Sequence, residues 1–196
     1  MAPTELNRKE SAHDRLLNAA AILFYNDGIA ATGIDAIVKK AGVAKKSLYN
    51  NFTSKAELVS EYLQTRHAEW LSLYEARVRQ AKGPAERVLS VFEAYADHAE
   101  HAHERGFRGC GLLNAAAELP VGDSGREAVR THKEEVEALL NKHLTELMPG
   151  EVERTEQLAQ HLAFLLEGAV VRAGLEGNAD CVIRAKHIAA SMLEAA

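Results

Sequence analysis

Apolar residues recur three and four positions apart along most of the chain, which is the spacing of one face of an α-helix. Near the N-terminus, for example, Leu16, Ala20, Leu23 and Phe24 fall on one such face. Only 4 prolines occur, and no regular strand-like alternation of apolar and polar residues lies between them. The sequence therefore predicts an all-α protein.

Glycine, proline and capping residues divide this pattern into nine expected helices. Ser54 and Glu57 form a capping box that opens the longest helix of the N-terminal half, and Thr32 stands three residues before Asp35 as a capping pattern. The expected bounds are about 14–27, 32–40, 44–51, 54–82, 84–104, 109–119, 124–148, 152–175 and 180–195.

Composition limits the class of protein. The 196 residues are 47% hydrophobic and 26% charged, which excludes a disordered or collagen-like chain. The longest uninterrupted apolar stretch, Ala19 to Tyr25, is too short to cross a bilayer. The charged segment Met1 to Asp14 lacks the apolar core of a secretory signal, and Cys110 and Cys181 form no metal-binding pair. We expect a cytoplasmic protein with no membrane span and no structural zinc.

Charge is distributed unevenly along the chain. The net charge is −5, but residues 1–60 sum to +2 and residues 61–196 to −7. The basic residues concentrate between Gly28 and Ser60, where five lysines face only Asp35 and Glu57. Such a surface suits the phosphates of a nucleic acid, although a solvated basic face is the commoner outcome.

Two of the expected short helices have the spacing of a helix-turn-helix. They are joined by Ala41-Gly42-Val43, and the second must present short polar or cationic side chains to a DNA major groove. Leu48 and Phe52 are expected to face the core. The outer face then carries Lys45, Lys46, Ser47 and Asn50.

The residues in this region resemble the N-terminal domain of the tetracycline-repressor (TetR) family. The similarity runs over about 50 residues without a gap and includes Ala41-Gly42-Val43, Leu48-Tyr49, Phe52 and Ser54-Lys55. It implies a DNA-binding transcriptional regulator, more often a repressor than an activator. Ala44 departs from the family, in which Ser or Thr is common, and Asn50-Asn51 replaces frequent aromatic residues or histidine. These departures leave the operator sequence open.

The resemblance also implies domains and DNA contacts. A DNA-binding domain of residues 1–55 precedes an effector-binding and dimerisation domain of residues 56–196. At the matching motif positions, the residues implied to contact phosphates are Thr32, Tyr49 and Lys55. Those implied to contact base edges are Lys45, Lys46, Ser47 and Asn50. Lysine suits guanine and asparagine suits adenine. Taken singly, Thr32 could be only a cap, Tyr49 a core-edge aromatic and Lys55 a solvated side chain.

The C-terminal body is implied to bind a small molecule that changes the separation of the two DNA-binding heads of a dimer. The heads must reach successive major grooves roughly 34–36 Å apart. Most of the candidate side chains for this effector could instead be core residues. Cys110 is either a reactive thiol beside Arg108 or a small buried residue. The candidates are Trp70, Phe92, Tyr95, Cys110, Asn114, Glu118, His132 and Phe164.

The segment from Leu158 to Leu175 is apolar almost all round, with Phe164, Val171 and Leu175 on a second face. A helix with two apolar faces must bury both. We expect a homodimer formed by this helix and the terminal one. A central helix in a monomeric bundle is the alternative.

Enzymatic motifs are lacking. The sequence contains no Gly-x-Ser-x-Gly elbow and no Gly-rich nucleotide motif, so no cofactor is expected. Glu100-x-x-His103 matches half of a di-iron motif, but its second copy, Glu10-x-x-His13, precedes the first expected helix. His98, His101 and His103 do not share one helix face, so no metal is expected. A ligand-binding or interaction protein of the same fold without DNA binding remains the alternative function.

Overall fold

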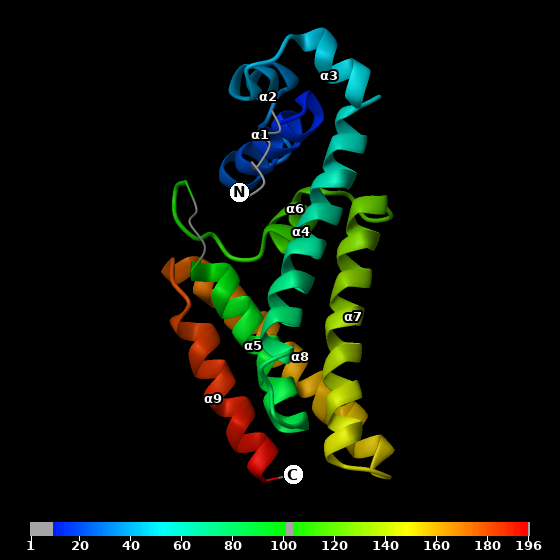
Figure 1. Ribbon diagram of the computed structural model, residues 1–196, viewed down its shortest axis with the longest axis vertical. Coiled ribbons are helices and arrows are strands. Elements are labelled where there is room, and N and C mark those ends of the chain that lie inside the picture. Colours follow the sequence, from blue (N-terminus) through cyan, green and yellow to red (C-terminus); the bar gives the residue numbers. More distant parts are fainter. Residues whose placement is uncertain (1–9, 101–103, 196) are drawn as a thin grey trace, which may run out of the picture. The chain divides into compact units, whose positions relative to one another are not determined.

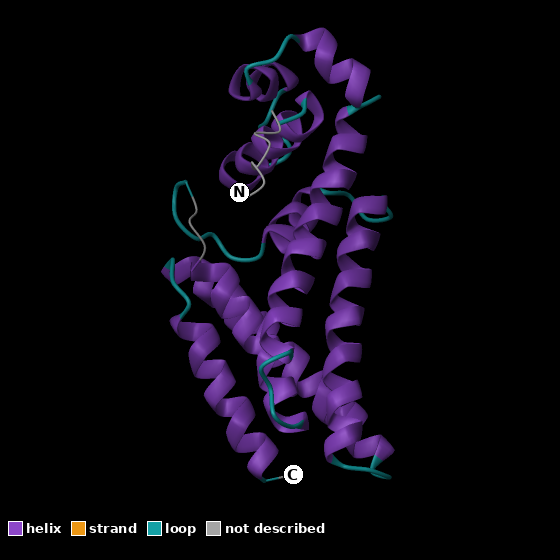
Figure 2. Ribbon diagram, viewed as in Figure 1, coloured by secondary structure: helices purple, strands orange, loops and turns teal. Residues whose placement is uncertain are grey.

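The computed structural model describes residues 10–100 and 104–195, and these residues contain nine helices and no strand (Figure 2). The predicted all-α class is confirmed. The helices are α1 (Ala12–Asp27), α2 (Ile34–Ala41), α3 (Lys45–Asn51), α4 (Lys55–Val78), α5 (Pro84–Glu100), α6 (Gly111–Glu118), α7 (Ser124–Leu147), α8 (Val152–Glu176) and α9 (Asp180–Glu194).

Two helices end four residues before the ends that their sequence patterns predict. α4 ends at Val78, before Lys82, because the amides of Gln80 and Ala81 bond three residues back and tighten the last turn. α5 ends at Glu100, and the next three positions lie outside the described residues.

The chain forms two compact units that divide between Tyr62 and Leu63, within α4. In the first unit α1 contacts both α2 and α3. Arg15 of α1 donates hydrogen bonds to the carbonyl oxygens of Ala41 (2.5 Å) and Gly42 (2.7 Å) and so fixes the turn between α2 and α3. Gly42 has a φ of 62°, and a Cβ there would lie 2.9 Å from the Arg15 guanidinium. A glycine is therefore required at this position.

The capping box at the start of α4 is confirmed. The Ser54 hydroxyl accepts a hydrogen bond from the Glu57 amide at 3.1 Å. The Glu57 carboxylate reaches back to Thr53, one residue earlier than in the usual box, where it accepts from the hydroxyl at 2.6 Å and from the amide at 2.5 Å. The bond from the Thr53 hydroxyl and then that from its amide lower the pKa of Glu57. The N-terminus of α4 is thus fixed by its own side chains.

The predicted cap at Thr32 is wrong. Gly33 is the N-cap of α2, and no side chain bonds to the amides there. The Thr32 hydroxyl instead donates to the Gly28 carbonyl at 2.6 Å, which satisfies it inside the preceding loop. Thr32 is 3% exposed, so its role is to hold this loop.

The second unit is a helical bundle. α7 contacts α5 and α8, and α9 contacts α5 and α8, while α6 contacts α7. Figure 1 shows α9 running beside α5. The core of this unit is built from fully buried aliphatic and aromatic side chains of α5, α7 and α8, namely Val88, Phe92, Leu140, Leu144, Leu162 and Leu166.

A close backbone approach joins the segment before α6 to α8. A Cβ added at Gly174 of α8 would lie 2.7 Å from the Cα of Gly109. Gly109 itself has a φ of 88°, which favours glycine. The two glycines therefore allow this segment, which leads into Cys110, to lie directly on α8.

α8 is long and apolar enough, by length and composition, to cross a membrane. Its uninterrupted apolar runs are short, because polar residues such as Glu167 interrupt them. Leu162 and Leu166 are nevertheless fully buried, and α8 contacts both α7 and α9. A core helix of a bundle satisfies the same criterion.

Candidate DNA-contacting helix and effector cavity

α3 has the two faces that the sequence predicts. Lys45, Lys46 and Asn50 are exposed, whereas Leu48 and Phe52 are at most 1% exposed. Ser47 is half-buried and Tyr49 is 55% exposed. Ala44 is the N-cap and makes no side-chain bond, so the amides at the start of α3 remain available to an anion.

Lys45 makes an ion pair with Asp35 of α2 at 2.8 Å, and this contact raises the pKa of Lys45. Both side chains are exposed, and an exposed ion pair of this kind contributes little stability. Lys45 is therefore a full cation that can exchange Asp35 for a phosphate or a base edge at small cost.

Lys55, like Thr32, is bonded within the first unit. Its ammonium donates to the Ile29 carbonyl at 2.6 Å. Together the two side chains hold the loop between α1 and α2. The predicted phosphate contact of either residue would require its polar group to bond DNA in addition to this loop.

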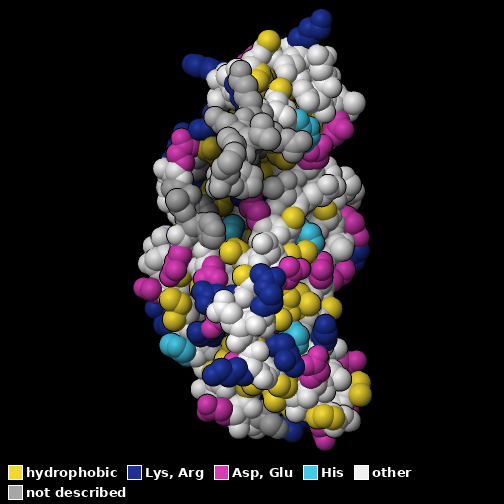
Figure 3. Space-filling view, in the orientation of Figure 1, with side chains coloured by type: hydrophobic (Ala, Val, Ile, Leu, Met, Phe, Trp, Pro, Cys, Tyr) yellow, Lys and Arg dark blue, Asp and Glu magenta, His cyan; other side chains and the backbone are white. Residues whose placement is uncertain are grey.

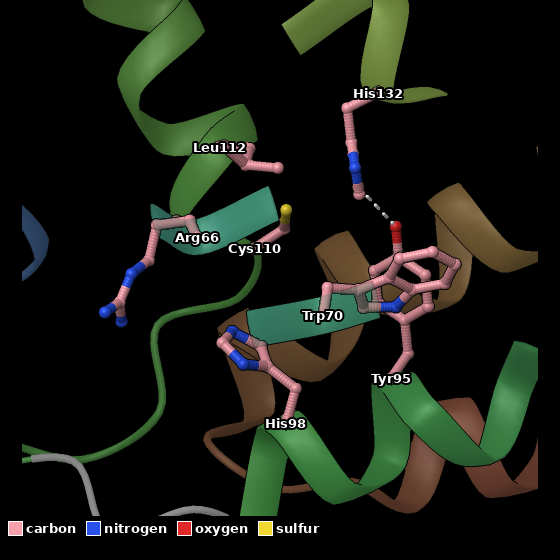
Figure 4. Close-up of a pocket in the computed structure, with 8 residues that line it drawn as sticks. Arg66, Trp70, Tyr95, His98, Cys110, Leu112 and His132 are labelled. Atoms are coloured by element: carbon pink, nitrogen blue, oxygen red, sulfur yellow. Dashed lines mark hydrogen bonds between the residues drawn. The ribbon is translucent and has the colours of Figure 1, made fainter. Parts of the chain in front are cut away.

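A small cavity in the second unit brings together four of the eight effector candidates: Trp70, Tyr95, Cys110 and His132 (Figure 4). It has a volume of about 10 Å³, room for about one water molecule. Figure 4 shows the Cys110 and Leu112 side chains directed into the space below His132, and Arg66 directed away from it. The remaining lining residues were not predicted from the sequence; they are Arg66, His98, Gly111 and Leu112.

The other four effector candidates lie elsewhere. Phe92 is fully buried in the core, and Asn114 donates to the Arg108 carbonyl at 3.0 Å. Glu118 is exposed at the end of α6. Phe164 is 62% exposed on α8. It lines neither this cavity nor the groove described below.

His132 is the centre of a hydrogen-bonded network. Its Nε2 lies 3.2 Å from the Tyr95 hydroxyl and its Nδ1 lies 2.9 Å from Nδ1 of His67. Lys133 donates to the Tyr95 hydroxyl at 3.3 Å. Burial lowers the pKa of His132 from 6.5 to about 3 and raises the pKa of Tyr95. Both rings are consequently neutral at physiological pH.

A larger groove lies between α4 and α7, beside the cavity. It has a volume of about 270 Å³ and shares Leu112 and His132 with the cavity. Its lining is Leu63, Gln64, His67, Leu112, Glu127, Ala128, Thr131, His132 and Glu135. His67 thus joins the groove to the buried network.

Surface charge on the second unit is mixed, with basic and acidic side chains interspersed on the face shown in Figure 3. Within the described part of the chain, no group of three or more His, Cys, Asp or Glu side chains could hold a metal ion. His101 and His103 lie outside the described residues.

Family models match both units. The model described as bacterial regulatory proteins, tetR family, matches residues 16–62. The model described as tetracyclin repressor-like, C-terminal domain, matches residues 84–189. The resemblance of the first unit to the TetR family is thereby confirmed and extends to the second unit.

Curated relatives match in part. The chain is 35% identical over 104 residues to the HTH-type transcriptional repressor KstR2 of Mycolicibacterium smegmatis, covering 53% of this chain and 50% of the relative. It is 33% identical over 100 residues to the HTH-type transcriptional activator FasR of the same organism, covering 51% and 45%. The chain thus spans about half the length of these relatives.

Solved structures match over nearly the whole chain. A TetR-family transcriptional regulator from Streptomyces coelicolor, SCO4454, superposes with a TM-score of 0.82 at 26% identity, covering 93% of both chains. A further regulator from Streptomyces avermitilis has a TM-score of 0.69 at 28% identity, covering 92% of this chain and 98% of the other.

Proposed function

Because the chain belongs to the TetR family of bacterial regulatory proteins, we propose that it is a DNA-binding transcriptional regulator. We further propose that it is a repressor that a small-molecule effector releases from its operator. The observation that carries the proposal is α3, whose Lys45, Lys46 and Asn50 are exposed while Leu48 is completely buried. Such a helix can enter a major groove with its polar face outward.

Five side chains of α3 contact DNA in this proposal. Lys45, Lys46, Ser47 and Asn50 meet base edges, and the exposed Tyr49 contacts a phosphate. Thr32 and Lys55 support the contact mainly through the loop that they hold between α1 and α2. The first domain, residues 1–55, then carries the DNA contacts, and residues 56–196 bind the effector and form the dimer.

The exposed apolar side chains of the last two helices support dimerisation. Phe164, Val171 and Leu175 project from α8, and Ile183 and Ile188 from α9. Exposed apolar residues gathered on two packed helices favour a protein partner. A two-fold pairing of α8 and α9 would bury these residues and bring two copies of α3 to one operator.

The effector acts by favouring one of two states of the dimer, and it must bind these states with different affinity. Trp70, which lines the cavity, belongs to α4, and α4 begins in the first unit at Lys55. A displacement of α4 is therefore the connection that we propose between effector and operator. The function requires access to DNA, which in a bacterium lies in the cytoplasm.

The test is a comparison of charge variants on DNA. A duplex is first selected from random sequences by the purified protein, and its affinity is measured by fluorescence anisotropy over a salt series. Replacing Lys45 and Lys46 by glutamine should remove up to two phosphate or base contacts, weaken binding at least about ten-fold and reduce the log–log salt slope by up to about 2. The control is Lys142→Gln, on the exposed surface of α7.

Equal effects of the two variants would remove α3 from the DNA interface. Failure of the wild-type protein to enrich any duplex would favour the alternative, a ligand-binding or interaction protein of this fold without DNA binding.

A further inference from the structure

The turn between α2 and α3 is held partly by its own backbone and partly by a side chain of α1. The amides of Gly42 and Val43 donate back to carbonyls of the last turn of α2, both at 3.2 Å, which is the Schellman arrangement at the end of a helix. The carbonyls of Ala41 and Gly42 accept from Arg15 of α1, at 2.5 Å and 2.7 Å. A single guanidinium nitrogen, Nη2, makes both of these bonds.

The direction of α3 depends on this turn. The N-cap of α3, Ala44, makes no side-chain bond. On the inner face Leu48 is completely buried, and Phe52, directly after the helix, is 1% exposed. These two apolar anchors hold α3 against the unit, but apolar contact has no preferred direction. The direction of α3 is therefore set where the chain enters it, at the peptide groups that Arg15 holds.

A small change of direction at the turn is enlarged along α3. Asn50 lies six residues beyond Ala44, which is about 9 Å along a helix axis. A tilt of about 10° at Ala44 would move Asn50 by about 1.5 Å. A side chain that reads a base edge must be held within about 0.5 Å of its bonding position. A flexible lysine can follow a phosphate over such a distance, so the direction of α3 matters most for base contacts.

We propose that Arg15 is a positioning residue for DNA recognition. It sets the direction of α3 through the carbonyls of Ala41 and Gly42 and does not itself contact DNA. Arg15 lies one residue before the segment that the tetR family model matches. The inference rests on the proposed function, DNA binding by α3, and it assigns part of the sequence specificity to a side chain of α1.

A direct phosphate contact is the other role that an arginine beside this turn can have. Each neutralised phosphate contributes about 0.9 to the log–log salt slope and strengthens binding to every duplex alike. A positioning residue strengthens binding to the preferred sequence and leaves the slope unchanged. The two roles of Arg15 therefore give different results in the same titration.

The test variant is Arg15→Met, which keeps an unbranched side chain but has no donor. Affinities and salt slopes are measured by fluorescence anisotropy with the selected duplex and with a scrambled duplex of the same composition. Arg15→Met should weaken binding to the selected duplex about ten-fold or more, change binding to the scrambled one less than about two-fold, and leave both slopes unchanged. The control, Lys39→Met at an exposed position of α2, makes the same change of net charge and should not alter the ratio of the two affinities.

Two results with Arg15→Met would overturn the proposal. An equal loss of affinity for both duplexes, with a slope reduced by about 0.9, would make Arg15 a phosphate contact. Unchanged affinities for both duplexes, with only a lower free energy of unfolding, would make it a residue that stabilises the fold alone. Urea unfolding at the temperature of the binding assay gives the folded fraction, so that all affinities refer to folded protein.

A second substitution acts on the same contact from the other side. A Cβ at Gly42 would lie 2.9 Å from Nη2 of Arg15, so Gly42→Ala must displace the guanidinium. This variant keeps Arg15 in the sequence and tests the contact even where Arg15→Met does not fold. Gly42→Ala should lower the ratio of the two affinities in the wild-type background and lower it less in the Arg15→Met background. Equal effects in both backgrounds would show that the two residues act independently, against the proposal.

Amide hydrogen exchange needs no DNA and so separates this inference from the proposed function. The Phe52 amide, bonded to the Leu48 carbonyl at 2.8 Å, reports on α3. The Gly28 amide, bonded to the Phe24 carbonyl at 3.1 Å, reports on the end of α1. Arg15→Met should speed exchange at Phe52 about ten-fold or more relative to Gly28.

The two failures are distinguishable. A wild-type protein that does not prefer its selected duplex would overturn the proposed function, whatever the exchange rates show. Unchanged exchange at Phe52 and an unchanged affinity ratio in Arg15→Met would overturn this inference alone and leave DNA binding by α3 standing.

Discussion

The buried His132 should make the second unit lose stability in mild acid. Burial, the largest cause, acts together with Lys133 and His67 to lower the pKa of His132 from 6.5 to about 3. Below pH 6.5 the unfolded state therefore binds a proton at His132 that the folded state does not bind. The contribution of His132 to the free energy of unfolding is complete above pH 6.5 and is lost as the pH falls toward 3. The full pKa difference corresponds to about 5 kcal/mol, of which about 2 kcal/mol is lost between pH 7.5 and pH 5.0.

The chain contains a convenient reporter of this loss. Trp70 is the only tryptophan, and its ring centroid lies 5.2 Å from that of His132. Urea unfolding followed by Trp70 fluorescence gives the free energy of unfolding at each pH. The matched variant is His132→Gln, whose amide can still accept from Tyr95 and donate to His67 but does not titrate. His143, whose pKa burial also lowers, titrates in both proteins and cancels from the comparison.

The wild-type protein should lose about 2 kcal/mol more than the variant between pH 7.5 and pH 5.0. Parallel losses in the two proteins would show that His132 titrates near its ordinary pKa. This result would refute both the lowered pKa that burial gives His132 and the neutral His132 on which the hydrogen-bonded network depends.

Three further substitutions test separate parts of the structure. Gly174→Ala should destabilise the second unit by about 1–3 kcal/mol in urea, because its Cβ would meet the Gly109 backbone, whereas Gly168→Ala, with no atom within 4 Å of the added carbon, should be neutral or stabilising. Ser54→Ala should lower the free energy of unfolding by about 1 kcal/mol through loss of the α4 cap. An unchanged free energy of unfolding would show that this cap does not stabilise the protein. Phe164→Glu should shift the protein from dimer to monomer in light scattering after size exclusion, and an unchanged mass would exclude Phe164 from the interface.

Helix positions could be predicted because their signals are local. Ser54 and Glu57 lie within one turn, so their spacing of three residues marks the start of α4 in the sequence alone. Thr32 failed as a cap because a competing acceptor, the Gly28 carbonyl, lies four residues back, and sequence alone does not decide between the two bonds. The exposed and buried faces of α3 followed from helical periodicity alone.

The effector site could be predicted only in part because it is assembled from distant residues. Trp70, Tyr95 and His132 were among the candidates named for the effector domain that the family resemblance implies, and they meet in the cavity. His67 was not among these candidates, since its partner lies 65 residues away on another helix. Phe164 belongs to a helix that is apolar on two sides, and periodicity does not determine which side faces the core.

The central claim, that this protein binds a specific DNA sequence, is tested most directly with the wild-type protein on two duplexes of equal composition. One is the duplex that the protein selects from random sequences, and the other is its scrambled version. Fluorescence anisotropy over a salt series should show affinity for the selected duplex about 10³-fold or more above that for the scrambled one, with a steep salt dependence for both. Equal and weak binding of the two duplexes would contradict the claim.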